Sequence, residues 1–588
     1  MSKESYSLPI LCFAAIAAAP VLGQSAGAVS IISFGAKADD FSDSTPAVAA
    51  ALKACRSGGV ETLTFAPGRY DFYPEQAGER YLFVSNNDEG LKRIAFDLSG
   101  IHNLRIDGQG AHFVFHGFIC PFLLEKSSDI VLQNFSIDYV RTFHSEGTIL
   151  SVNAEGMELG FAPEFPHDVR NGVLVFTSGA KTVGQQTSVT SGEVLFPYGS
   201  LLEYDPIKRE TAYMAQDYWV AGGIAAKQLP AGHVKLLMPG ITGTPGNVLV
   251  FGAARRDVPG FVLSESRDVR LEGIDLFHCG GMGVIAQRSH NIAIERMRVT
   301  QAPGSGRVVS ITADATHFVN CTGRIVLKDC LFEGQKDDAT NVHGIYSRIT
   351  RRLAADRVEV KLVHPQQFGL DFFTPGMKLE LVHGPSLVTY GEAEVKSVVR
   401  VNKEYSQLTF TAPLPVEFIT GDVVANEAEN QSEVSITGCT IRCNRARGIL
   451  LGSRGKIRVE GNTFHTPGAA ILLEGDGCFW FEQAGVRDLV IRSNTFDNCN
   501  YGVWGEGVIA VGSGILPSER AHSRYNRNIL IEGNLFRQFD SSPIIHAYSV
   551  SGLTYRDNRQ EQTTAYPSWR KSGPRFVITD SDAVSIEE

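Results

Sequence analysis

Ile457-Arg458-Val459-Glu460-Gly461-Asn462-Thr463-Phe464 is the stretch that decides the fold, because versions of it recur through most of the chain. Apolar and polar residues alternate in it, and glycine and asparagine then precede another apolar residue. A period of two bounded by Asn, Gly and Asp is typical of a strand followed by a turn. Related stretches begin at Leu104, Ile130, Val269, Ile292, Ile325, Leu489 and Ile529.

The spacing of these copies predicts a solenoid. Equivalent positions recur every 23 residues, as from Leu276 to Val299 and from Ile441 to Phe464, or at longer intervals where a loop is larger. A single coil cannot bury its own apolar face, so successive coils must stack to complete a core. We therefore predict an all-β fold, a right-handed parallel β-helix.

The first coil of such a helix needs a cover, because the open end of a solenoid invites edge pairing. Residues 42–55 fit an N-terminal capping helix: Asp43 or Ser44 can cap it, Pro46 lies near its first turn, and small apolar residues form a stripe.

Two stretches break the period and carry short alternating strands with a Pro-Gly turn, which predicts two small antiparallel β-barrels inserted into loops of the helix. The second barrel should stand beside the acidic coil that precedes it. The resulting division is a signal peptide over 1–28, β-helix over 29–142, the first barrel over 143–255, central coils over 256–345, the second barrel over 346–430 and C-terminal coils over 431–575.

The composition limits the possible partners. The formal net charge is −10 over 588 residues, with no basic stripe and no zinc-ligand spacing, so we expect no nucleic-acid partner. Nine cysteines remain once Cys12 leaves with the signal, and an odd number without framework spacing indicates mostly reduced core residues. Exposed barrels would also allow a homodimer.

The N-terminus has the features of a secretory signal. Lys3 precedes an apolar stretch over residues 8–22, and small residues follow, with cleavage after Gly23 or Ala28. A membrane anchor is the alternative. We expect a secreted or periplasmic protein with no membrane association after cleavage.

Three carboxylates give the best indication of chemistry. Asp-Ala-Thr occurs at 314–316 and again at 338–340, and Asp337 precedes the second copy. The offset of 24 residues is about one coil. Asp314 and Asp338 should therefore stack roughly 4.8 Å apart, with Asp337 one residue out of phase. Such carboxylates repel one another unless a water or a shared proton lies between them.

Glycoside hydrolysis would use this arrangement. Acetal cleavage needs a proton donor for the leaving oxygen and, for inversion, a carboxylate that activates water. We assign the acid role to Asp337, whose carboxylic form its charged neighbours should favour, and the water-activating role to Asp314 and Asp338. Two alternatives stay open from residue types alone: a turn in which aspartates accept from backbone N–H groups, and a calcium site.

These residues also resemble a family. Thr312-Ala313-Asp314 with Gln335-Lys336-Asp337-Asp338 is similar to the Asn-Thr-Asp and Asp-Asp pattern of polygalacturonase-like β-helix hydrolases, although their Gly-His-Gly and Arg-x-Lys motifs have no convincing match. Instead His343-Gly344 ends the string that starts at Asp337. That string, together with two barrel insertions, resembles glycoside hydrolase family 110, the exo-acting α-1,3-galactosidases, over about residues 30–560.

The resemblance implies an inverting enzyme without metal or cofactor that removes terminal α-1,3-galactose from an oligosaccharide, as on blood-group B glycans. It implies the same roles for the three aspartates. We expect sugar binding, with weaker support, from Asn341, His343, Glu474, Trp504 and Glu506. The rivals are another β-helix enzyme of the polygalacturonase or lyase type, and a non-catalytic glycan-binding β-helix protein.

Overall fold

A computed structural model describes residues 27–587 apart from 179–181, 184–185, 188–193 and 416–418. The predicted signal peptide therefore lies outside the described residues, except for its last two positions. Among the described residues, no helix is both long and apolar enough to cross a membrane.

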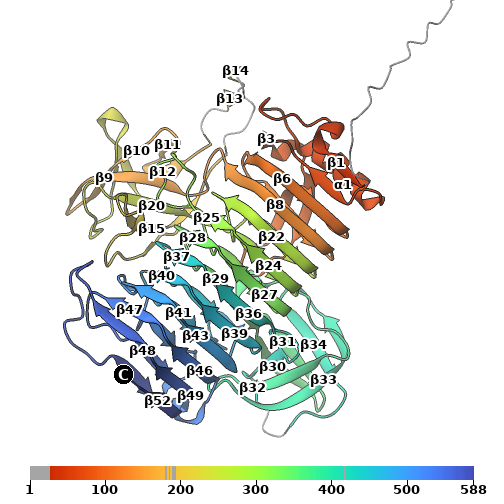
Figure 1. Ribbon diagram of the computed structural model, residues 1–588, viewed down its shortest axis with the longest axis vertical. Helices are drawn as coiled ribbons and strands as arrows, with labels where there is room; N and C mark the ends of the chain where they lie inside the picture. Colours follow the sequence, from red (N-terminus) through yellow and green to blue (C-terminus); the bar gives the residue numbers. More distant parts are fainter. Residues whose placement is uncertain (1–26, 179–181, 184–185, 188–193, 416–418, 588) are drawn as a thin grey trace, which may run out of the picture.

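The chain winds into a parallel β-helix, which confirms the predicted fold (Figure 1). Each coil supplies strands to three parallel ladders. The first ladder contains β2 (Thr62–Thr64), β6 (His102–Phe115), β8 (Ser128–Tyr139), β22 (Arg267–Leu276), β24 (His290–Glu295), β27 (Thr322–Lys328), β36 (Glu433–Thr437), β39 (Lys456–Glu460), β43 (Asp488–Arg492), β46 (Asn526–Glu532), β49 (Val550–Arg556) and β52 (Asp582–Ile586).

The second ladder contains β3 (Gly68–Phe72), the second halves of β6, β8 and β22, then β25 (Arg298–Val299), β28 (Leu331–Glu333), β37 (Thr440–Arg442), β40 (Thr463–His465), β44 (Thr495–Asp497), β47 (Leu535–Gln538) and β50 (Arg559–Gln562). The third contains β5 (Gly90–Asp97), β7 (Cys120–Glu125), β21 (Phe261–Ser264), β23 (Val284–Gln287), β26 (Thr316–Val319), β29 (Thr340–Ile345), β38 (Ile449–Leu451), β41 (Ile471–Leu473), β45 (Ile509–Val511), β48 (Ile545–Tyr548) and β51 (Phe576–Thr579).

Identical residues stack from coil to coil along the C-terminal part. The Nδ2 of Asn462 donates to the Oδ1 of Asn494 at 3.0 Å, and the Nδ2 of Asn494 donates to the Oδ1 of Asn534 at 3.0 Å. Beside them Phe464, Phe496 and Phe536 stack inside the core. Because these coils turn at the same place, the Asn-x-Phe pattern becomes one column of amides and one of rings.

The helix α1 (Thr45–Arg56) closes the N-terminal end, as predicted. Asp43 accepts the Thr45 N–H at 2.9 Å, and Val48, Ala51 and Leu52 are buried. Of the nine described cysteines, seven are buried, in keeping with their predicted place in the core.

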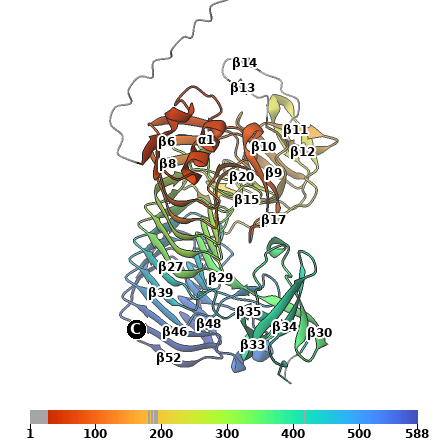
Figure 2. The same cartoon turned by 90° about the vertical axis from the view of Figure 1, so that its right-hand side faces the viewer.

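Both insertions project from the same side of the helix (Figure 2). The first is an antiparallel sheet of eight strands: β9 (Ser145–Asn153), β10 (Gly156–Phe161), β15 (Tyr198–Asp205), β16 (Glu210–Thr211), β17 (Tyr218–Trp219), β18 (Ala226–Gln228), β19 (Val234–Leu236) and β20 (Val248–Ala253). The second is a closed barrel with the strand order β30 (Ser347–Ala354), β31 (Arg357–Lys361), β34 (Tyr405–Phe410), β33 (Val388–Arg400), β32 (Lys378–His383) and β35 (Val423–Asn426).

Candidate active site

Three aspartates meet where the chain enters the third ladder. Asp314 lies two residues before β26, while Asp337 and Asp338 lie in the turn between β28 and β29. Thr316 pairs with Thr340, so Asp314 and Asp338 occupy equivalent positions on successive coils, as their spacing predicted. Both are buried, whereas Asp337 is partly exposed, and all three line one pocket.

Arginines surround these carboxylates. The Nη2 of Arg256 lies 2.6 Å from Asp337 Oδ2, and Arg445 and Arg447 approach the same carboxylate at 3.4 and 3.9 Å. Arg447 also donates to both oxygens of Asp338, from Nε at 3.0 Å and from Nη2 at 2.8 Å. Asp337 and Asp338 are therefore each paired with at least one guanidinium group.

The arginines change which aspartate holds a proton. Burial would raise the pKa of Asp337, but the charges of Arg256, Arg445 and Arg447 lower it below its ordinary value. The prediction that its neighbours favour the carboxylic form of Asp337 is therefore wrong for this structure, because sequence reasoning did not include the three guanidinium groups.

The raised pKa values belong to the two stacked aspartates instead. Burial, with the charge of Asp337, raises the pKa of Asp314 well above its ordinary value. Burial also raises the pKa of Asp338 to about 7, against the lowering effect of Arg447. The pKa shifts thus favour the acid form of Asp314 and the carboxylate form of Asp337 in one pocket.

Other side chains complete the pocket wall, among them Asn86, Asn341, Leu450, Glu474, Trp480 and Glu482. Asn341 and Glu474 were predicted as sugar-binding residues and do lie beside the aspartates. Burial raises the pKa of Glu474 to about 7, so this group can also donate to a sugar hydroxyl. Trp480 supplies an exposed ring of the kind that packs on sugar faces.

The remaining predicted residues lie elsewhere. His343 is buried behind the pocket, where its Nε2 lies 2.8 Å from the Nε2 of His317. The Nε1 of Trp504 donates to Asp217 at 3.0 Å, and neither residue lines the pocket. Glu506 is exposed and lines no part of this pocket, so its predicted contact with the sugar has no support in the geometry.

Asp217 and Arg445 connect the pocket to the first insertion. Arg445 donates to Asp217 from Nη2 at 2.8 Å and also faces Asp337. Its guanidinium carbon lies 5.9 Å from the ring centre of Trp219 and 5.6 Å from that of Trp504. The first insertion therefore borders the carboxylates through Asp217 and Arg445.

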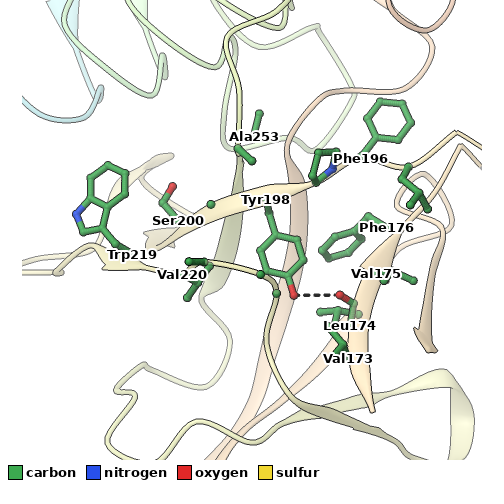
Figure 3. A pocket seen from close by; sticks show the side chains of 17 residues that line it. Val173, Leu174, Val175, Phe176, Phe196, Tyr198, Ser200, Trp219, Val220 and Ala253 are labelled. Carbon is green, nitrogen blue, oxygen red and sulfur yellow. Dashed lines mark hydrogen bonds between the residues drawn. The ribbon is translucent and has the colours of Figure 1, made fainter. Parts of the chain in front are cut away.

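A larger pocket of about 560 Å³ lies within the first insertion (Figure 3). It is lined by Val173–Phe176, Phe196, Val220 and Ala253, and the Tyr198 hydroxyl donates to the Leu174 carbonyl at 3.0 Å beside it. Its lining contains no carboxylate, imidazole or amine, so volume alone does not identify the reactive site.

Guanidinium groups already neutralise Asp337 and Asp338, and Asp314 pairs with a histidine, so the arrangement does not favour calcium, which takes oxygen ligands. A second group, His317, His343 and Glu482, has ligand-type atoms within 4.8 Å of one another. The 2.8 Å contact between the two Nε2 atoms is a hydrogen bond, shorter than the separation of two nitrogens on one zinc ion, which is about 3.3 Å for bonds of 2.0 Å.

Sequence reasoning missed several residues of the site. A signal for His317 was present, because it pairs with Asn341 in the same register that relates the aspartates. Arg447 pairs in register with Asp338, since Ile449 lies opposite Thr340, but the second insertion separates them in sequence. Arg256 and Glu482 lie outside the strands of the repeating ladders, where the repeat gives no information.

Known protein families match the two insertions and the C-terminal part of the β-helix separately. The family models that match are GLAA-B beta-barrel domain I over residues 145–249, GLAA-B beta-barrel domain II over 357–424 and the right handed beta helix region over 424–586. The alpha-1,3-galactosidase A of Shewanella woodyi is 37% identical over 548 residues, which cover 92% of this chain and 87% of that protein.

The alpha-1,3-galactosidase B of Bacteroides thetaiotaomicron is 30% identical over 588 residues, covering 98% of this chain and 92% of that protein. Among solved structures, the family 28 exopolygalacturonase of Yersinia enterocolitica has a TM-score of 0.42 and 10% identity, covering 96% of this chain and 78% of that one.

Proposed function

The chain belongs to the α-1,3-galactosidase family, glycoside hydrolase family 110, and from that premise we propose that it is a glycoside hydrolase that removes terminal α-1,3-linked galactose from glycans. The observation that carries this proposal is the single pocket holding Asp314, Asp337 and Asp338, whose pKa values are moved in opposite directions. Glycosidic bonds are cleaved by such pairs of carboxyl groups in different protonation states.

In the proposed reaction Asp337 donates a proton to the glycosidic oxygen, and Asp314 and Asp338 hold and deprotonate the attacking water, with inversion at the anomeric carbon. Asp337 must first gain a proton. A galactose whose hydroxyl groups accept from Arg256 and Arg447 would draw these donors from Asp337 and exclude water, and both changes raise the pKa of Asp337. Asp338, whose pKa is raised to about 7, supplies the proton.

The leaving glycan would lie on the side of Asp337 that faces Arg445 and Asp217, because the acid must contact the leaving oxygen. Trp219 is 75% exposed at that side and offers a ring to the second sugar. Asn341, Glu474 and Trp480 would contact the galactose itself.

We also propose export, supported by the apolar N-terminal stretch. Cleavage after Gly23 would leave β1 (Ala28–Ser30) complete, and that strand pairs with β2. The homodimer stays a prediction.

The deciding experiment follows the anomer released from Galα1-3Gal and from the fucosylated B trisaccharide by NMR, in the presence of a chelator. Initial β-galactose is expected, and the preferred substrate shows whether a neighbouring fucose is needed. The Asp337→Asn variant should lose nearly all activity with its circular dichroism unchanged. Initial α-galactose would overturn inversion, normal activity of Asp337→Asn would overturn the acid assignment, and no galactose from either glycan would overturn the proposed function.

A further inference from the structure

A chain of hydrogen-bonded side chains runs behind Asp314, away from the pocket opening. The Nδ1 of His317 lies 2.7 Å from Asp314 Oδ2, and the Nε2 of His317 lies 2.8 Å from the Nε2 of His343. The Nδ1 of His343 lies 2.7 Å from the carbonyl oxygen of Gly344. Both histidines are 1% exposed, so each polar atom depends on its protein partner.

These contacts fix where the protons lie. A carbonyl oxygen only accepts, so the Nδ1 of His343 carries a hydrogen, and its Nε2, in the neutral ring, is an acceptor. The Nε2 of His317 must then donate to it, which leaves the Nδ1 of His317 as an acceptor in the neutral ring. The hydrogen between Asp314 Oδ2 and the Nδ1 of His317 is therefore supplied by Asp314, which is a carboxylic acid when both rings are neutral.

The charge environment agrees with this assignment. Burial lowers the pKa of His317 to about 4 and raises the pKa of Asp314. Burial likewise lowers the pKa of His343. The charged and titratable groups that face this chain are Asp337, Asp338, Arg256, Arg447 and Glu482.

A protonated Asp314 cannot take a proton from water, so the proposed function requires this group to lose its proton first. The 2.7 Å bond to His317 offers the shortest path. The O–H bond of Asp314 breaks and an N–H bond forms at the Nδ1 of His317, which gives a carboxylate beside an imidazolium. The resting pKa values oppose this transfer, so the ion pair is a short-lived state. Glu482, whose carboxylate lies 3.4 Å from the Nε2 of His343, offsets the new positive charge.

Glu482 is suited to that part. Burial would raise its pKa, but the two histidines and the amide groups of Asn341 and Asn86 lower it, so Glu482 is ionised. The amides donate to it at 3.3 and 3.0 Å. The strand β42 (Glu482–Gln483) holds it against β29 by antiparallel pairing.

We propose that His317, held in place by His343 and Glu482, is the positioning residue that takes the carboxyl proton of Asp314 and so allows Asp314 to act as the base. This inference rests on the proposed function. Once Asp314 is a carboxylate, it accepts one proton of the water while the water oxygen bonds to the anomeric carbon, and the other O–H becomes the anomeric hydroxyl. The proton on His317 leaves to solvent after the product departs.

The test is the pH dependence of the His317→Asn variant with Galα1-3Gal as substrate. Asparagine keeps a polar atom near the position of Nδ1 but cannot be ionised. We expect KM to stay within about twofold, and kcat to fall by at least about tenfold at pH 6, since proton-transfer groups contribute about 10²–10⁴-fold. The loss should shrink toward pH 8.5, where Asp314 can lose its proton directly to solvent.

A loss of equal size at every pH, or no loss, would overturn the proposal, because a structural role does not depend on protonation. The matched control is His290→Asn: His290 bonds Thr322 from the exposed face of β24, and its replacement should leave kcat unchanged at every pH.

A second measurement does not depend on a variant that folds or on activity. Nitrogen-15 NMR of the labelled histidines should show, at pH 7, His343 with its hydrogen on Nδ1 and His317 with its hydrogen on Nε2. A neutral His317 protonated on Nδ1 would overturn the chain of bonds. If the wild-type protein releases no galactose, the proposed function fails, while the NMR result still shows whether the chain exists.

Discussion

Replacing Arg256 with glutamine should move the alkaline limit of activity upward, even though it removes a residue of the pocket. The Nη2 of Arg256 lies 2.6 Å from Asp337 Oδ2, closer than any other guanidinium group around that carboxylate. If Asp337 is the acid, activity falls as the pH rises through its pKa. Arg256 lowers that pKa, so its removal must raise it.

The size of the shift follows from the contact. One opposite charge within about 4–6 Å lowers the pKa of a carboxyl group by about 1–3 units. Arg445 and Arg447 stay in place at 3.4 and 3.9 Å and still stabilise the carboxylate. We therefore expect a shift near the lower bound, so the alkaline limb of kcat, which reports the enzyme with substrate bound, should move up by about one pH unit, equivalent to about 1.4 kcal/mol.

The assay is kcat at saturating Galα1-3Gal from pH 4 to 10 in wild type and in Arg256→Gln. The absolute value should drop at the optimum, since a donor to the sugar is lost, while the alkaline limb moves up. Arg255→Gln is the matched control, because Arg255 pairs with Asp257 at the surface and lines no part of the pocket. An alkaline limb that stays at its wild-type pH in Arg256→Gln would refute Asp337 as the group that limits activity at high pH.

Two further predictions concern the coil stack and the leaving-group side. Asn494→Ala removes four bonds of the asparagine column, two made by Nδ2 and two accepted by Oδ1, and should cost about 3–4 kcal/mol at about 1 kcal/mol each. Calorimetry should show Tm lower by about 3 °C, given about 2.1 cal/mol/K of unfolding entropy per residue, and an unchanged Tm would contradict the role of the column. Trp219→Ala should raise KM for Galα1-3Gal by about tenfold, as expected when an aromatic contact of about 1.4 kcal/mol is lost, and leave KM for α-galactosyl fluoride, which has no second sugar, unchanged. Equal effects on both substrates would place Trp219 elsewhere.

Sequence reasoning identified those parts of the site that follow the period of the coil. The offset between Asp314 and Asp338 is one coil, so their stacking could be predicted without coordinates. The same register would have placed His317 opposite Asn341. Arg447 follows Asp314 and Asp338 in their column. The second insertion separates Asp338 from Arg447 in the sequence and hides this relation.

Residues outside the period could not be predicted, because nothing in the repeat determines their position. Arg256 belongs to the segment that returns from the first insertion, and Glu482 to a short strand that pairs antiparallel with β29. Arg256 lowers the pKa of Asp337, and Glu482 places a carboxylate beside His343. Omitting the guanidinium groups of Arg256, Arg445 and Arg447 led to the wrong direction for the pKa of Asp337, since neighbouring carboxylates alone would have raised it.

Stacking in register explains why the chemistry lies at this place in the helix. A coil-to-coil column stabilises the fold when it repeats an amide or a ring, because each member bonds or packs with the next. A column of carboxylates does the opposite, since each added charge raises the pKa of its neighbours. Here Arg447 follows the two aspartates in the column and pairs with Asp338. The raised pKa values of Asp314 and Asp338 favour their protonated forms, which relieves the remaining repulsion. The feature that would destabilise an ordinary coil is thus the one that keeps exchangeable protons beside an ionised Asp337, which is what acid and base catalysis in one pocket requires.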